Sequence, residues 1–329
     1  MSVTKNENFI SIIGFIIIFT AVIGFFTFMN PNFLTAKYFL TMFKNVTIIA
    51  IASIGLTFVI AVNHTDLSFY LTAGFSAMFM SWLISKNFSV PAAVITALIG
   101  SVVFGFTTGF AIGVARLPDI ISTIAIGVIA YGCSYLFSNG QKIYVNKSNI
   151  SFLNDGNILG IPTPIFFLLL FYIIFFILME KTKYGTYIFA AGSNRIAARL
   201  SGINTNAVII FSYILCTVFS SFAGMISTAS RGNGDVATTA NFLMPCFTAV
   251  FIGSAVFKRP NLLGTFLGAF FVRMMIDGVL LLGIPYYVGD LVTSILLIIS
   301  LLISKLNTFG SFKRIRLVAA VNTKGGVAK

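Results

Sequence analysis

Ten stretches of this sequence are long, apolar and almost free of charge. Each is close to the roughly 20 residues that an α-helix needs to cross a bilayer, at about 1.5 Å per residue. They are too long for barrel strands, in which apolar and polar residues alternate. The sequence therefore predicts an all-α membrane protein of about ten transmembrane helices, at residues 9–29, 44–62, 67–85, 90–115, 120–137, 161–179, 207–229, 242–257, 262–283 and 286–304.

The charge content favours the same fold class. Only 9% of the 329 residues are charged, whereas a soluble domain carries about 25%. We expect residues 1–329 to form a single transmembrane domain, with the first apolar stretch retained because it exceeds the core of a typical signal peptide. Only residues 63–66 separate the second and third stretches, so one of these helices is expected to be broken or re-entrant, which gives eight to ten helices.

The basic residues predict the orientation. If both termini lie in the cytoplasm, fourteen of the 21 Lys and Arg residues fall in inner segments and six in outer segments. This asymmetry agrees with the positive-inside rule. The net charge of +13 then reflects topology. The basic residues are scattered over several loops, so no nucleic-acid partner is expected. Membrane lipid is the expected contact.

The residue types that catalytic and metal sites need are scarce. His64 is the only histidine, and Cys133, Cys216 and Cys246 lie inside apolar stretches without CxxC spacing, so no metal site is expected. No GxxxxGK[ST] loop occurs, so we expect no ATP hydrolysis and no cofactor on this chain. No nucleophile, base and acid can be assembled into a catalytic set, which argues against an enzyme.

A few charged residues lie inside the apolar stretches or beside them. Arg273 and Asp277 are four residues apart, so they share a helix face and can form a pair that is either structural or part of a polar pathway. Asp66 follows the second stretch, where it either caps the next helix or marks a polar break beside a substrate path.

Two stretches carry small residues at helical spacing. Gly105, Gly109 and Gly113 recur every four residues, and Gly264 and Gly268 repeat the pattern. Small residues at this spacing allow two membrane helices to approach closely. We expect tight helix packing at both places, either static or along a moving seam.

One internal segment, residues 180–206, is more polar than the rest and lies on the cytoplasmic side in this topology. Within it, residues 192–202 (GSNRIAARLSG) predict a short helix. Ser193 or Asn194 can cap its first backbone N–H groups, and Gly202 can end it in a left-handed conformation.

The predicted short helix has two stripes. Ile196 and Leu200 form an apolar stripe, and Arg195 and Arg199 form a basic stripe beside it. Such a helix either lies on lipid headgroups or docks into a groove of a cytoplasmic partner. A permease without its own ATP site needs a contact of the second kind.

Six stretches resemble the membrane subunit of ribose-type, carbohydrate-importing ABC transporters. The resemblance covers roughly residues 30–304, and residues 183–204 are its most diagnostic part. The stretches are GLTFVIAVNHTDLS, YLFSNGQ, LGIPTP, KYGTYIFAAGSNRIAARLSGIN, RPNLLGTFLGAF and LLLGIPYYVGDLV.

This resemblance implies a permease fold similar to that of vitamin B12-type importers, in the bacterial plasma (inner) membrane. It also implies three partners: an ATPase subunit that holds ATP and Mg, an extracytoplasmic sugar-binding protein, and a second permease chain that forms a homodimer or heterodimer. The polar loop would couple to the ATPase. The expected coupling residues are Gly192, Ser193, Asn194, Arg195, Ala198, Arg199, Leu200 and Gly202.

The expected function is ATP-driven import of a monosaccharide such as ribose. The expected pathway residues are Asp66, Ser68, Asn139, Arg273 and Asp277. Residues 64–70 and 273–278 depart from the family pattern, which leaves the identity of the sugar open.

Two alternatives remain at this point. Within the same class, the solute could be autoinducer-2, a small polyol or a nucleoside. From another class, an ion-coupled secondary transporter could use Asp66, Asp277 and Asp290 as titrating groups.

Overall fold

The computed structural model describes residues 2–304, which are almost entirely helical. The helices are α1 (Ser2–Met29), η1 (Pro31–Leu34), α2 (Ala36–Ala61), α3 (Phe69–Ser85), α4 (Val90–Gly113), α5 (Asp119–Ser138), α6 (Lys147–Asp155), α7 (Thr163–Lys181), α8 (Lys183–Ser193), α9 (Arg195–Leu200), α10 (Thr205–Arg231), α11 (Val236–Ala240), α12 (Leu243–Phe257) and α13 (Leu262–Leu281), followed by a helix at Tyr286–Ser304. Four short strands are β1 (Ile143–Tyr144), β2 (Asn157–Ile158), β3 (Ile161–Pro162) and β4 (Asn233–Gly234).

The all-α membrane fold is confirmed. Within residues 2–304, nine helices are long and apolar enough to cross a membrane, and the 17-residue α3 is a shorter apolar helix. The second helix begins at Ala36, earlier than the predicted start at residue 44. Its first turns carry Lys37 and Lys44, and Lys44 Nζ lies 3.6 Å from Asp155 Oδ1, so these charges belong to the helix end and not to a loop.

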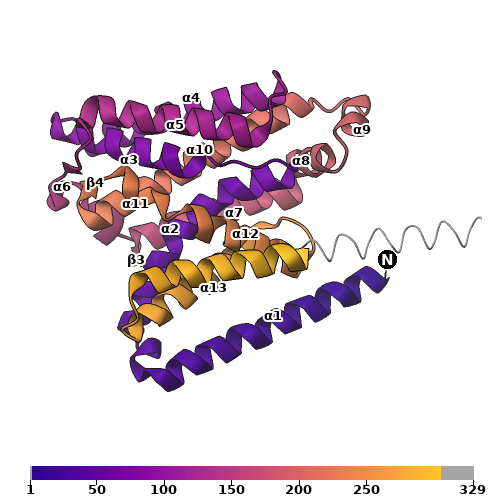
Figure 1. The fold of residues 1–329 in the computed structure, drawn as a ribbon, viewed down its shortest axis with the longest axis horizontal. Coiled ribbons are helices and arrows are strands. Elements are labelled where there is room, and N and C mark those ends of the chain that lie inside the picture. The colour runs from indigo at the N-terminus through magenta and orange to yellow at the C-terminus, as the bar shows by residue number, and fades with distance from the viewer. Residues whose placement is uncertain (1, 305–329) are drawn as a thin grey trace, which may run out of the picture.

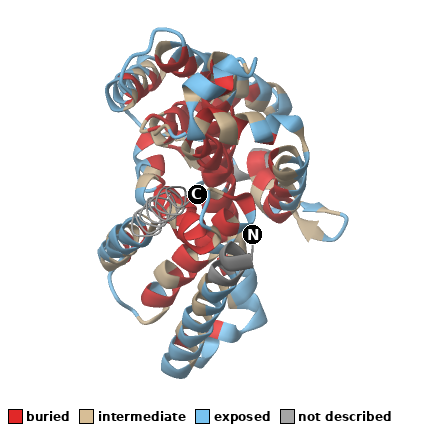
Figure 2. Ribbon diagram, turned by 90° about the vertical axis from the view of Figure 1, so that its right-hand side faces the viewer, coloured by how far each residue is buried: buried red, intermediate tan, exposed pale blue. Residues whose placement is uncertain are grey.

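The centre of the bundle is built from α2 and α10. Most of their residues are buried, whereas α1, α4, α5 and the helix Tyr286–Ser304 lie at the periphery and bury few (Figure 2). The peripheral helices expose large apolar side chains, such as Ile17, Ile121 and Ile298. Apolar side chains on the outside are costly in water but not in lipid, which explains the high hydrophobic content of the chain.

The predicted glycine ladders lie at tight helix contacts. A Cβ on Gly105 or Gly109 of α4 would lie 2.7 or 2.6 Å from the Cα atom of Ile214 or Ile210 in α10. Glycine is required at both positions because the backbones meet there. On the other side of the bundle, Gly268 of α13 packs in the same way on the α12 backbone.

Two membrane segments are interrupted. Residues 62–68 form no helix between α2 and α3, as the short polar separation predicts, but neither of these two helices is itself broken. The eighth segment divides into α11 and α12 at residues 241–242. At both places some residues are buried, such as Asp66 and Phe242, and others are exposed, such as Asn63 and Asn241.

The ends of the segments separate into two sides of the molecule. Figure 1 shows the N-terminus, the end of the last described helix and α9 on the right-hand side. Successive spanning helices run in opposite directions. The loops 62–68, 114–118 and 258–261 therefore lie on this same side, as expected for ten crossings. Six of the basic residues counted for orientation lie outside the described residues: Lys305, Lys313, Arg314, Arg316, Lys324 and Lys329.

The opposite side carries the small strands and α6. Strand β1 pairs antiparallel with β4, with Ile143 opposite Gly234, and β2 pairs with β3 in a tight turn. Lys142 Nζ lies 3.0 Å from Asp235 Oδ2 and links the two strands at one end of the β1–β4 pair.

Candidate functional site

The polar loop folds as the sequence predicts. Helix α9 begins after Asn194, whose Oδ1 accepts hydrogen bonds from the N–H groups of Ile196 (3.1 Å) and Ala197 (3.0 Å). It ends before Gly202, which has a φ of +82°. Asn194, and not Ser193, is the N-cap, and a left-handed glycine stops the helix as expected.

The two predicted stripes of α9 have different environments. Ile196 and Leu200 are 76% and 84% exposed, although both are apolar. Ala198 faces inward and is buried. In a helix that lies beyond the ends of α4 and α10 (Figure 1), such exposed apolar side chains suit a protein groove.

Arg195 points back to the bundle. Its Nη2 donates to the carbonyl of Gly113 at 2.6 Å and to Asn206 Oδ1 at 3.0 Å, so it joins α9 to the end of α4 and the start of α10. Arg199 remains exposed and donates a longer hydrogen bond of 3.4 Å to the same Asn206 oxygen. The basic stripe therefore contains one anchoring arginine and one exposed arginine.

Glycine allows α8 to approach the central helices. A Cβ on Gly192 would lie 2.1 Å from the carbonyl oxygen of Ala61 at the end of α2. The loop is thus held against the last turn of α2, just before the break at residues 62–68. A movement of α8 would press directly on this break.

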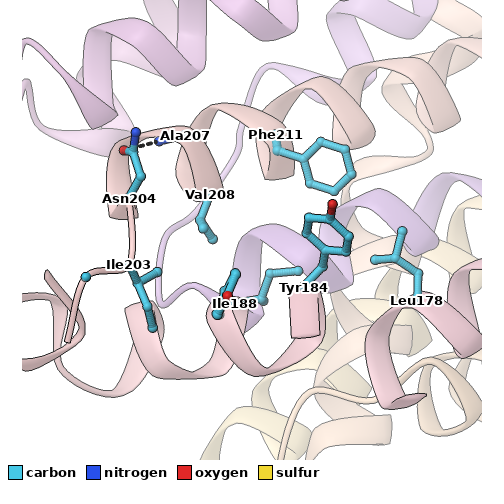
Figure 3. A pocket seen from close by; sticks show the side chains of 10 residues that line it. Leu178, Tyr184, Ile188, Ile203, Asn204, Ala207, Val208 and Phe211 are labelled. Carbon is cyan, nitrogen blue, oxygen red and sulfur yellow. Dashed lines mark hydrogen bonds between the residues drawn. The ribbon is translucent and has the colours of Figure 1, made fainter. Parts of the chain in front are cut away.

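Beside this contact, α8 and α10 do not pack fully. A hollow of about 660 Å³ separates them, lined mainly by apolar side chains that include Tyr184, Ile188, Val208 and Phe211 (Figure 3). The loop therefore contacts α2 closely at Gly192 and leaves a hollow between α8 and α10.

Asp66 and Ser68 lie together in the break between α2 and α3. Both are fully buried, and Asp66 Oδ1 accepts hydrogen bonds from the Ser68 N–H (2.7 Å) and hydroxyl (2.6 Å). Asp66 Oδ2 has no hydrogen-bond partner within the described residues. Ser68 packs on Gly127, about 12 Å along α5 from its start, so the break reaches into the bundle.

The break is tied to two neighbouring helices. His64 Nδ1 lies 2.7 Å from Asp119 Oδ2, and the Thr65 N–H donates to the same oxygen at 3.2 Å. The Tyr213 hydroxyl of α10 donates to the Thr65 carbonyl at 3.0 Å. The backbone around Asp66 is therefore held by α5 and α10.

Arg273 and Asp277 form the expected pair. Arg273 Nε lies 3.0 Å from Asp277 Oδ2, and Arg273 Nη2 contacts Oδ1 at 2.5 Å, which makes the contact bidentate. From α2, the Tyr38 hydroxyl donates to the Asp277 carbonyl at 2.6 Å, and Asn45 Nδ2 lies 3.4 Å from its carboxylate. The pair joins α13 to α2.

The five predicted pathway residues thus occupy three places. Asp66 and Ser68 lie together, and Arg273 and Asp277 lie together near the C-terminal end of α13, beside the first turns of α2. Asn139 is exposed at the outer end of α5, where it adopts a left-handed conformation with a φ of +50°. Their assignment to a substrate path stays a prediction.

Sequence reasoning missed three residues around these sites. Asn206 accepts from both arginines of α9, and Asp119 binds the break. Arg116 lies beside α9 but counted only toward the orientation of the chain. Its position in a short loop between two apolar stretches was the only sequence signal for a role at this end of the molecule. Its proximity to α9 depends on the fold.

Comparison with known proteins identifies the family. Residues 38–301 match the model of a family described as the branched-chain amino acid transport system / permease component. The chain belongs to this family. It is a permease component of ABC importers and not an enzyme, and its relatives support the ribose type that the sequence resembles.

Several curated relatives match over most of their length. The ribose import permease protein of Escherichia coli strain K12 is 26% identical over 281 residues, which cover 84% of this chain and 88% of the relative. The galactofuranose transporter permease protein of the same strain is 28% identical, with 82% and 80% covered. The L-arabinose ABC transporter permease protein of Azospirillum brasilense is 24% identical, with 88% and 86% covered. No solved structure matches the chain closely enough for comparison.

Proposed function

We propose that this permease carries a monosaccharide, ribose or a similar simple sugar, into the cytoplasm of a bacterium, driven by ATP hydrolysis on a separate subunit. The observation that carries the proposal is that the relatives above are named for ribose, galactofuranose and arabinose and align over more than four fifths of this chain. The family description names branched-chain amino acids, so these are the competing substrates to test.

The proposed partners are an ATPase subunit, an extracytoplasmic sugar-binding protein and a second permease chain. The protein would lie in the plasma (inner) membrane with both termini in the cytoplasm. The charge asymmetry of the loops supports this orientation. ATP and Mg would bind the ATPase subunit.

Helix α9 is the proposed contact with the ATPase subunit. Its exposed Ile196 and Leu200 support this assignment, because they form a short apolar ridge at the end of the bundle. Gly192 and Arg195 would transmit the movement, since they join the loop to α2, α4 and α10.

The proposed mechanism is alternating access. Closure of the ATPase subunits moves α8 and α9, and the contact of Gly192 with Ala61 carries this motion to the break that contains Asp66. The hollow between α8 and α10 gives the loop space to shift. The bundle then opens outward or inward, and the sugar released by the binding protein passes through without covalent chemistry.

Transport by reconstituted vesicles tests the proposal. The permease, its ATPase subunit and its binding protein are placed in proteoliposomes, and uptake of labelled ribose, arabinose, galactose and leucine is compared. We expect uptake of a sugar that requires both ATP and the binding protein. Uptake of leucine alone would overturn the proposed substrate class.

The matched control separates the transporter classes. An ATPase subunit with its phosphate-loop lysine replaced is reconstituted in the same way, with and without a protonophore. The proposal requires that uptake stop with the inactive ATPase and continue with the protonophore. The opposite result would favour the ion-coupled alternative.

A further inference from the structure

Three arginines surround a hollow on the cytoplasmic side of the molecule. Arg116, from the loop between α4 and α5, faces Arg195 and Arg199 of α9 across a space of about 330 Å³. Ile196 and Leu200 complete its lining. We call these five residues the arginine pocket.

Among the described residues, no carboxylate lines the arginine pocket. The nearest acidic residue that influences Arg195 is Asp119, which already binds His64 and the Thr65 N–H. Arg116 forms no hydrogen bond or ion pair within residues 2–304. Its charge is therefore not neutralised by the part of the chain that the structure describes.

Arg195 carries one donor that no described residue satisfies. Its Nη2 binds Gly113 and Asn206, but its Nε is buried without a hydrogen-bond partner among the described residues. A buried donor without a partner costs about 1–3 kcal/mol. Burial, together with the charges of Arg199 and Arg116, also lowers the pKa of the Arg195 guanidinium below its ordinary value.

The lining defines the ligand chemistry. Guanidinium groups present several N–H donors in a plane and bind carboxylates or phosphates in bidentate geometry. The two apolar side chains on the rim require an apolar neighbour for the anion. A free inorganic anion would leave these side chains exposed.

We propose that the arginine pocket receives an acidic side chain, flanked by apolar residues, from the ATPase subunit. The inference rests on the proposed function, because it names the chemistry of the partner at α9. The anion would satisfy the three guanidinium groups while Ile196 and Leu200 enter the partner's groove. Arg116 then becomes a docking residue contributed by a second loop.

A protein ligand fits the observations better than a lipid headgroup. Helix α9 lies at the tip of the bundle, beyond the ends of the spanning helices α4 and α10 (Figure 1). Both apolar side chains on its rim project from this tip and are more than three quarters exposed. A lipid headgroup remains the competing ligand, and the experiment separates the two.

The test compares two charge reversals at the same end of the molecule. Arg116→Glu changes the pocket, and Lys258→Glu changes an exposed residue that follows α12 and does not line it. Both purified variants are titrated with the ATPase subunit in detergent. We expect Arg116→Glu to weaken binding by about tenfold or more and to reduce its salt dependence, and Lys258→Glu to bind as the original protein does.

A suppressor identifies the acidic partner. Asp and Glu residues of the ATPase subunit are changed singly to Lys, and one of them is expected to restore binding to Arg116→Glu. Unchanged binding of Arg116→Glu would overturn the proposal. So would a loss of transport that occurs only in vesicles containing phosphatidylglycerol and not in phosphatidylcholine, with ATPase binding unaffected, because the pocket would then bind lipid.

The test also separates this inference from the proposed function. If the original protein binds no ATPase subunit at all, the proposed function fails. If it binds the subunit and Arg116→Glu binds equally well, only the acidic contact fails.

Discussion

The charged side chains at the two ends of the molecule differ in their interaction partners. Near the outer end of α13, the Arg273 guanidinium binds the Asp277 carboxylate at two atoms, and α2 adds two further polar contacts. At the end that carries α9, Arg116, Arg195 and Arg199 surround a hollow that no carboxylate of the described residues lines. One site is neutralised within the chain, and the other is not.

The difference follows from the surroundings. A charge inside the bilayer has neither water nor a partner protein to stabilise it, so the fold must supply its counter-charge. A charge at the cytoplasmic end is stabilised by water until another molecule replaces that water. We infer that the outer pair holds the bundle together, whereas the cytoplasmic arginines are available for recognition.

Breaking the outer pair should have the largest effect on stability. Asp277→Ala leaves the Arg273 guanidinium without its carboxylate, and removing one partner of a buried pair costs about 3–5 kcal/mol. Thermal unfolding of the purified protein in detergent measures the loss.

The double variant Arg273→Met/Asp277→Leu is the control. It should recover most of the stability, because neither charge is left alone. A stable double variant that cannot transport would show that the pair serves the substrate path as well. Equal instability of the single and double variants would contradict a structural pair.

At the cytoplasmic end, Gly202→Pro should abolish transport while the protein stays in the membrane. Gly202 has a φ of +82° and its N–H donates to the Arg199 carbonyl at 3.0 Å. Proline fixes φ near −65° and removes that donor, at a cost of about 3 kcal/mol in a helical setting. Uptake and binding of the ATPase subunit are measured together.

Gly160 offers a matched control on the opposite side. It has a φ of +83° in the turn between β2 and β3, so Gly160→Pro imposes the same backbone conflict far from α9. Binding of the ATPase subunit should survive this change. Normal import by Gly202→Pro would refute the role of the loop in coupling.

The smallest expected effect comes from the cap of α9. Asn194→Ala removes the acceptor for two N–H groups and should destabilise α9 by about 1 kcal/mol. Hydrogen exchange of residues 195–200 should rise severalfold, while Asn194→Asp should remain close to the original. Unchanged exchange in Asn194→Ala would mean that packing of Ala198, and not the cap, maintains the helix.

Local patterns predicted much of the architecture. The long apolar runs identify the membrane segments, and the short polar separation at residues 63–66 indicates the break between α2 and α3. The N-cap and terminal glycine of α9 were also predictable, because capping depends on residues only a few positions apart. Arg273 and Asp277 pair for the same reason, since helical periodicity brings residues four apart onto one face.

Other features depend on distant parts of the chain. The sequence by itself determined a lipid-embedded helical bundle with a capped short helix in its polar loop, because spans and caps are set by hydrophobicity and local hydrogen bonding. Only the tertiary structure decided that Arg195 turns inward to Gly113 and that Arg116 joins α9 at one pocket. Both contacts depend on where α4, α5 and α10 end relative to one another, and packing between the helices sets those positions.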